Sequence, residues 1–217
     1  MYNKFDACIF DLDGTLINSL EDLAASTNYA LKKLGFPSHN IDNYRYFIGH
    51  GVTKLLEVTL PEDARIPEVI DKARKLFDEY YSTHYLDTTK PYDGIIMLID
   101  ELREKDLKLA VVSNKPHNYV EKIINSLFSD KFDTFLGQRP GVPRKPDPTG
   151  IFDACLKLGV KSENCLYLGD SGLDMQTAVA AGAFPLGVLW GFRDRNELES
   201  YGAKAVISNP AELLEII

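Results

Sequence analysis

The stretch Ala7-Cys8-Ile9-Phe10-Asp11-Leu12-Asp13-Gly14-Thr15-Leu16 runs from four apolar residues into two aspartates and a glycine. A short apolar run without alternation is typical of a strand buried on both faces of a sheet. Gly14 permits a sharp turn where the chain leaves the sheet. We therefore expect a strand at 7–10, with Asp11 and Asp13 at its carboxyl end.

Similar short apolar runs recur along the chain, at 109–112, 165–168, 186–189 and 205–207. Between them, apolar residues recur at helical spacing over 95–102, 120–127 and 151–156. Strands that alternate with helices in this way indicate a parallel sheet with helices on both faces. The predicted fold class is therefore α/β.

One long segment, 16–88, interrupts this alternation with helical spacing alone. Ser19 and Asp22 are spaced as a capping box for a helix that ends at Gly35. Helical patterns follow at 52–60 and 67–85. We expect two domains, a core built from 1–15 and 89–217 and a helical domain at 16–88.

Composition excludes several classes of protein. The 217 residues carry a net charge of −8, from 32 acidic and 24 basic residues. Such a balance argues against a nucleic-acid footprint, and no apolar run approaches the roughly 20 residues that span a bilayer. A signal peptide would need an uninterrupted apolar run near the N-terminus, where this sequence has Asp6, Asp11 and Asp13. We expect a cytoplasmic protein with neither nucleic-acid nor membrane partners.

The chain contains three cysteines, Cys8, Cys155 and Cys165, each in an apolar segment. An odd, scattered set fits neither a disulfide framework nor a zinc site. We expect all three to be small core residues.

Polar residues of unusual type follow three of the predicted strands. The groups are Asp11 with Asp13, Ser113 with Asn114 and Lys115, and Asp170 with Ser171. The carboxyl ends of parallel strands form the ligand-binding edge of such sheets, so we expect these groups to meet. Aspartates without Cys or His suit a hard cation, and Asp11, Asp13 and Asp170 predict a Mg²⁺ site. Alternatively, each aspartate caps the helix that follows it.

Three further positions complete the predicted site. Ser113 and Asn114 can donate hydrogen bonds to phosphate oxygens, and Pro116 suits the first position of the next helix. Lys145, in a proline-rich loop, would supply a fixed positive charge. Asp174 either orients Lys145 or is a favourable acid near a helix N-terminus.

Together these residues resemble four motifs of the haloacid dehalogenase superfamily, and specifically of its phosphatase branch. The motifs are Asp11-Leu12-Asp13-Gly14-Thr15-Leu16, Ser113, Lys145, and Gly169-Asp170-Ser171 with Asp174. The resemblance implies a Rossmann-like core with an inserted α-helical cap. It also implies that Asp11 attacks phosphorus, forming an aspartyl-phosphate, and that Asp13 acts as acid and then base. Asp11, Asp170 and the backbone carbonyl of Asp13 would hold Mg²⁺, while Ser113 and Lys145 clamp the phosphate.

The segments 112–116, 48–52 and 187–191 resemble phosphoglycolate phosphatases within that branch. The implied substrate is a small phosphorylated metabolite, with 2-phosphoglycolate first, and Arg45 and His50 of the cap would read its carboxylate. A sugar-phosphate mutase of the β-phosphoglucomutase kind, an inorganic pyrophosphatase and a non-catalytic phosphate-binding module are the alternatives. Both a monomer and a homodimer fit the sequence.

Overall fold

The computed structural model describes residues 5–217, which divide into two compact units. One unit combines the chain up to Ile17 with the chain from Pro91 onward, and the other is Asn18–Lys90. Each unit is described by itself below, the first as the core unit and the second as the helical unit.

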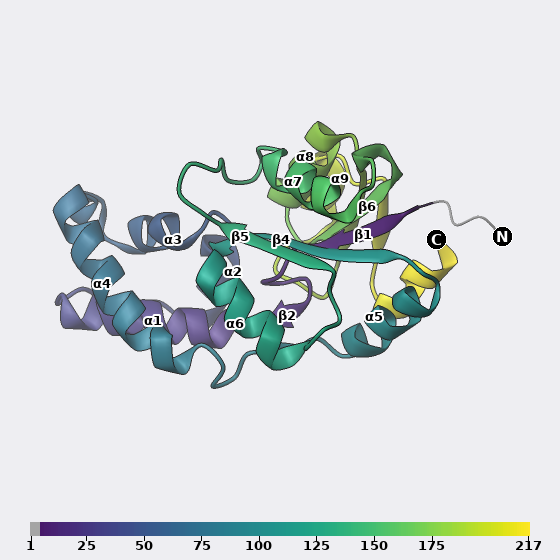
Figure 1. Cartoon of the computed structure of the whole chain (residues 1–217). Coiled ribbons are helices and arrows are strands. Elements are labelled where there is room, and N and C mark those ends of the chain that lie inside the picture. The colour runs from purple at the N-terminus through teal and green to yellow at the C-terminus, as the bar shows by residue number, and fades with distance from the viewer. Residues whose placement is uncertain (1–4) are drawn as a thin grey trace. The chain divides into compact units, whose positions relative to one another are not determined.

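The core unit is built on a six-stranded sheet in the order β5-β4-β1-β6-β7-β8 (Figure 1). Its strands are β1 (Ala7–Phe10), β4 (Lys108–Pro116), β5 (Thr134–Gln138), β6 (Cys165–Gly169), β7 (Phe184–Val188) and β8 (Ala205–Ile207). Neighbouring strands all pair in parallel, and β1 lies between β4 and β6. The predicted α/β fold with a parallel sheet is confirmed.

Helices cover both faces of this sheet. They are α5 (Ile95–Glu104), α6 (His117–Leu127), α7 (Thr149–Leu158), α8 (Gly172–Ala181) and α9 (Arg195–Ser200), with short 3-10 turns at η3 (Ser162–Asn164) and η4 (Pro210–Glu215). In Figure 1, α5 and α6 lie on one face, and α7, α8 and α9 lie on the other. Each crossover between adjacent parallel strands therefore carries a helix, as such connections require.

The strands alternate their side chains between two buried layers. Ala7 and Ile9 pack with residues of α7 and α8, and that layer also holds Cys155 and Cys165. On the opposite face, Phe10 meets Phe132 edge-on, with ring centroids 6.0 Å apart. All three cysteines are buried and free of disulfides, as predicted.

The edge strand β5 was missed by the hydrophobic pattern. Its sequence, Thr134-Phe135-Leu136-Gly137-Gln138, includes only two large apolar residues, and three of the five are partly exposed. A side chain does not fit at Gly137, which interrupts the apolar run. A Cβ there would lie 2.6 Å from the Cα of His117 and from the carbonyl oxygen of Lys115. β5 thus packs against the end of β4 and the start of α6 through its backbone.

The helical unit consists of α1 (Leu20–Lys33), η1 (Ile41–Asn43), α2 (Tyr44–Phe47), α3 (Val52–Thr59), η2 (Glu62–Ala64) and α4 (Pro67–His84). Pro67 occupies the first turn of α4, where its missing N–H costs no hydrogen bond. The long helices α1 and α4 pack together, and Tyr29 stacks on Tyr80 with ring centroids 4.7 Å apart. The two connections to the core unit, β2 (Ile17–Asn18) and β3 (Lys90–Pro91), pair as a two-stranded sheet.

The predicted capping box at Ser19 and Asp22 is wrong. Ser19 occupies the N-cap position of α1, but its side chain makes no capping hydrogen bond. The buried carboxylate of Asp22 instead accepts from the backbone N–H and the hydroxyl of both Thr88 and Thr89, at 2.6–3.2 Å. These residues are too far along the chain for a local pattern to reveal. The contact ties the start of α1 to the segment that follows α4.

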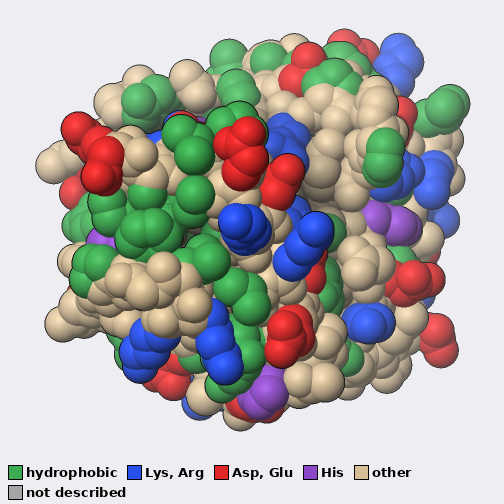
Figure 2. Space-filling view, turned by 90° about the vertical axis from the view of Figure 1, so that its left-hand side faces the viewer, with side chains coloured by type: hydrophobic (Ala, Val, Ile, Leu, Met, Phe, Trp, Pro, Cys, Tyr) green, Lys and Arg blue, Asp and Glu red, His purple; other side chains and the backbone are tan. Residues whose placement is uncertain are grey.

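Basic and acidic side chains are intermingled on the face of the protein drawn in Figure 2. Among residues 5–217, no helix combines the length and the apolar character that crossing a membrane requires.

We predict that Asp22→Ala destabilises the helical unit by about 2–4 kcal/mol, because it leaves the donors of Thr88 and of the buried Thr89 without their acceptor. The midpoint of urea unfolding and the hydrogen exchange of those two amides measure the effect. Glu21→Ala, at the exposed neighbouring position, is the control and should change stability by less than about 0.5 kcal/mol. Equal effects of the two substitutions would contradict the role given to Asp22.

Candidate functional site

Lys145 is the centre of a buried polar cluster at the carboxyl edge of the sheet. Its Nζ lies 2.8 Å from Oδ1 of Asp11 and 2.6 Å from Oδ1 of Asp174. Burial by itself would lower the pKa of Lys145, but the two carboxylates outweigh it and hold that pKa well above its usual range. The lysine is therefore a permanent cation between two acidic side chains.

The carboxylate of Asp174 makes two sets of contacts, one with Lys145 and one at the start of α8. Its Oδ1 contacts Lys145, while its Oδ2 accepts from the backbone N–H and hydroxyl of Ser171 at 3.1 and 2.6 Å. Ser171 and Asp174 form a capping box at the start of α8. The same carboxylate therefore begins the helix and positions the lysine.

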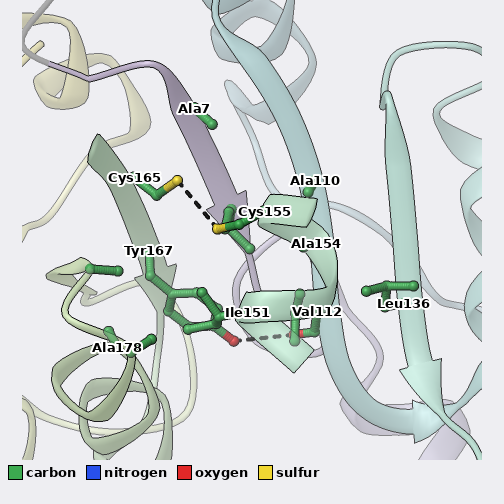
Figure 3. Close-up of a cluster of buried hydrophobic side chains, with 13 residues drawn as sticks. Ala7, Ala110, Val112, Leu136, Ile151, Ala154, Cys155, Cys165, Tyr167 and Ala178 are labelled. Atoms are coloured by element: carbon green, nitrogen blue, oxygen red, sulfur yellow. Dashed lines mark hydrogen bonds between the residues drawn. The ribbon is translucent and has the colours of Figure 1, made fainter. Parts of the chain in front are cut away.

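Tyr167, in the middle of β6, was not identified from the sequence. Its hydroxyl donates to the carbonyl oxygen of Val112 at 3.1 Å, as Figure 3 shows, and accepts from Nζ of Lys145 at 3.2 Å. Burial raises the pKa of Tyr167 well above its usual range, which keeps the hydroxyl protonated. The tyrosine thus supports Lys145 from the core side, but in sequence it looks like any aromatic residue of a buried strand.

The residues after Val112 remain in β4 as far as Pro116, which corrects the prediction that Pro116 is the first residue of a helix; it caps α6 instead. The amide side chain of Asn114 accepts from the backbone N–H of Lys145 at 2.9 Å and donates to its carbonyl at 3.4 Å. Asn114 therefore holds the backbone of the Lys145 loop, a role different from the phosphate contact expected of it. Ser113 is also buried, and its hydroxyl oxygen accepts from the backbone N–H of Lys115 at 3.3 Å.

Asp13 pairs with Lys115, a second lysine, to which the sequence pattern assigned no role. Nζ of Lys115 lies 3.0 and 3.2 Å from the two carboxylate oxygens of Asp13. The side chain of Lys115 is only 3% exposed and that of Asp13 is 12% exposed. The two aspartates of the first motif therefore each contact a different lysine.

Asp170 is enclosed by backbone. A Cβ at Gly14 would lie 2.2 Å from its Oδ2, and a Cβ at Gly191 would lie 2.3 Å from its Cβ. The N–H of Phe192 donates to Oδ2 of Asp170 at 2.8 Å. Burial raises the pKa of Asp170 well above its usual range, and the charges of Asp174 and Asp11 add to this shift.

The cluster fits a hard divalent cation. Asp11, Asp170 and Asp174 each offer a carboxylate oxygen, and these oxygens lie within 4.8 Å of one another. Burial raises the pKa of Asp11 to about 7 despite the attraction of Lys145, so its negative charge is costly without further positive charge. Because Lys145 and Ser171 already occupy the oxygens of Asp174, Asp11 and Asp170 are the side chains left for a metal.

The structure brings most of the predicted site residues together in the core unit. They are Asp11, Asp13, Ser113, Asn114, Lys145, Asp170 and Asp174. Arg45 and His50 belong to the helical unit, Arg45 in α2 and His50 just before α3, and both are exposed.

Known proteins resemble this chain over nearly its whole length. A sequence model of haloacid dehalogenase-like hydrolases matches residues 8–188. The phosphoglycolate phosphatase of Aquifex aeolicus is 35% identical, over 96% of this chain and 95% of that protein. The phosphoglycolate phosphatase of Vibrio parahaemolyticus is 29% identical, over 96% and 94%.

Solved structures agree with this likeness. A crystal structure from Lactobacillus delbrueckii superposes with a TM-score of 0.93 at 33% identity and covers 99% of both chains. A haloacid dehalogenase-like hydrolase of Streptococcus pneumoniae superposes with a TM-score of 0.88 at 26% identity and covers 98% of both chains.

We predict that Asp170→Asn raises the melting temperature of metal-free protein at pH 8 by about 2–6 °C, because it removes one of several crowded negative charges. The same substitution should abolish the stabilisation that Mg²⁺ gives to the unaltered protein. Differential scanning calorimetry with EDTA and with Mg²⁺ measures both effects. Asp130→Asn, at an exposed position between α6 and β5, is the control. Undiminished stabilisation of Asp170→Asn by Mg²⁺ would place the cation elsewhere.

Proposed function

The chain belongs to the haloacid dehalogenase-like hydrolase family and is a phosphoric monoester hydrolase, and we propose that it cleaves a small phosphorylated metabolite, with 2-phosphoglycolate first, through an aspartyl-phosphate on Asp11. The observation that carries this proposal is the contact of Lys145 with Asp11. An anionic nucleophile that must approach an anionic phosphate needs such a fixed cation.

In the first step, an Asp11 carboxylate oxygen attacks phosphorus, and the bond from phosphorus to the ester oxygen breaks. Asp13 donates a proton to that departing oxygen, so the leaving group departs as an alcohol and not as an alkoxide. Lys145 offsets the repulsion between Asp11 and the phosphate, and the hydroxyl of Ser113 donates to a phosphoryl oxygen. Asp174 and Tyr167 hold Lys145 in place for this role.

In the second step, a water attacks the phosphorus of the aspartyl-phosphate, and Asp13 takes up the proton of that water. The bond between phosphorus and the Asp11 oxygen breaks, which releases inorganic phosphate and restores both aspartates to their first state. Asp11, Asp170 and the backbone carbonyl of Asp13 would hold a Mg²⁺ ion, which would supply further positive charge to the phosphoryl group. The pairing of the Asp13 carboxylate with Lys115 supports the view that Asp13 contacts the metal through its carbonyl.

We further propose that the inserted segment, 16–88 by the sequence, acts as a cap over this site. Arg45 and His50 are exposed, so their side chains are accessible to a leaving group. The Asp22 contact supports the proposal, because it gives the segment firm ends at both connections to the core unit. The buried free cysteines suit a reducing, cytoplasmic location.

We predict that Asp11→Asn lowers kcat by about a thousandfold or more, because the amide is a poor nucleophile. Phosphate release with Mg²⁺ is measured on 2-phosphoglycolate, pyrophosphate, several sugar phosphates and an aryl phosphate. A kcat/KM for 2-phosphoglycolate at least about tenfold above the others is expected, and acid-quenched protein should carry phosphate on Asp11.

Other results of that panel have distinct meanings. A preference for pyrophosphate, or conversion of glucose 1-phosphate to glucose 6-phosphate, would replace the proposed substrate. Unchanged turnover by Asp11→Asn would contradict the mechanism itself.

We predict that Tyr167→Phe lowers kcat about tenfold with little change in KM, because Lys145 loses one hydrogen-bond partner while its charge remains. Steady-state kinetics on the best substrate of the panel measures the effect. Tyr119→Phe, a buried tyrosine of α6, is the matched control. A loss confined to KM would assign Tyr167 to substrate binding instead.

A further inference from the structure

We propose that Lys115 selects substrates whose leaving group carries a carboxylate one carbon from the ester oxygen. This inference rests on the proposed function and extends it, because it assigns recognition of the leaving group to a residue of the core unit. The assignment starts from the position of Lys115 beside Asp13.

Both the backbone and the side chain of Lys115 are held in place by the core unit. It is the penultimate residue of β4, so the strand fixes its backbone, and its side chain is 3% exposed. Its Nζ contacts both carboxylate oxygens of Asp13, at 3.0 and 3.2 Å. A lysine this deeply buried is rare without an ionic role, and here its ammonium already binds a carboxylate.

Asp13 connects this lysine to the leaving group. The ester oxygen must contact Asp13 in order to receive its proton. In 2-phosphoglycolate, one methylene separates that oxygen from the substrate's own carboxylate. The substrate carboxylate therefore lies close to the other groups that contact Asp13. One of these groups is the ammonium of Lys115.

Charge makes the contact selective. Once Asp13 has given its proton to the ester oxygen, its carboxylate would repel the carboxylate of the leaving group unless a cation lies with them. The low exposure of Lys115 strengthens its attraction for a second anion, since water screens it poorly. A leaving group without a carboxylate gains nothing from this lysine. Lys145 cannot do the same for the leaving group, because Asp11, Asp174 and Tyr167 surround its amine.

The test compares 2-phosphoglycolate with ethyl phosphate, which has a methyl group in place of the carboxylate. The measured quantity is the ratio of their kcat/KM values. Lys115→Met should lower this ratio by about tenfold or more, and Lys115→Arg should retain part of it. Lys108→Met, at the exposed first residue of the same strand, is the matched control and should leave the ratio unchanged.

A parallel fall for both esters would overturn the inference, since Lys115 would then act on Asp13 alone. Calorimetric binding of glycolate, the product, gives a readout independent of turnover. Glycolate should bind the unaltered enzyme at least about tenfold more tightly than Lys115→Met, and equal affinities would also overturn the inference. If the unaltered enzyme released no phosphate from 2-phosphoglycolate, the proposed substrate would fail, and the two glycolate affinities would still decide the role of Lys115.

Discussion

Negative charge crowded at one edge of a sheet is the constraint on which the rest of the core depends. Asp11 and Asp170 leave adjacent parallel strands, and Asp174 follows one helical turn later, all of them buried. Lys145 is held against two of these carboxylates. The surrounding residues keep the arrangement from relaxing: the capping box fixes Asp174, Asn114 fixes the loop of the lysine, and glycines bring backbone against Asp170. Such a cluster stores unfavourable electrostatic energy that a bound cation would relieve.

The residues of this site that could be predicted are mainly those whose positions follow from the parallel direction of the strands. Asp11, Ser113 and Asp170 each follow an apolar run, and parallel strands bring such positions to a common edge whatever the distance between them in sequence. A separate argument, from charge, identified Lys145 and Asp174, because a site for an anion and a metal needs a fixed cation and that cation needs an acidic partner. Elements with strong apolar runs, such as β1 and β6, were equally predictable.

Contacts that depend on side-chain direction were not predictable. Tyr167 has the spacing of a core residue, and only its hydroxyl, which reaches Val112 and Lys145, sets it apart. Asn114 looked like a phosphate donor because its neighbour Ser113 did, yet its amide matches the backbone of a loop. Asp22 lay at the right spacing for a local cap, but stronger donors from Thr88 and Thr89 occupy it. The apolar pattern did not predict the edge strand β5, because Gly137 interrupts it. The close packing of β5 requires a glycine at that position.

The central place of the first strand has a consequence for the order in which the protein is made. Among the helices and strands of residues 5–217, β1 is synthesised first, yet one of its two neighbours, β6, begins only at Cys165. The helical unit is complete by Lys90, so all of its internal partners exist while β1, which precedes Asp11, still lacks its partner β6. A nascent chain that stops before Cys165 keeps β1 as an open edge, exposed to pairing with other chains. Synthesis past that residue closes the sheet on both sides of Asp11 and assembles its acidic neighbours in the same event.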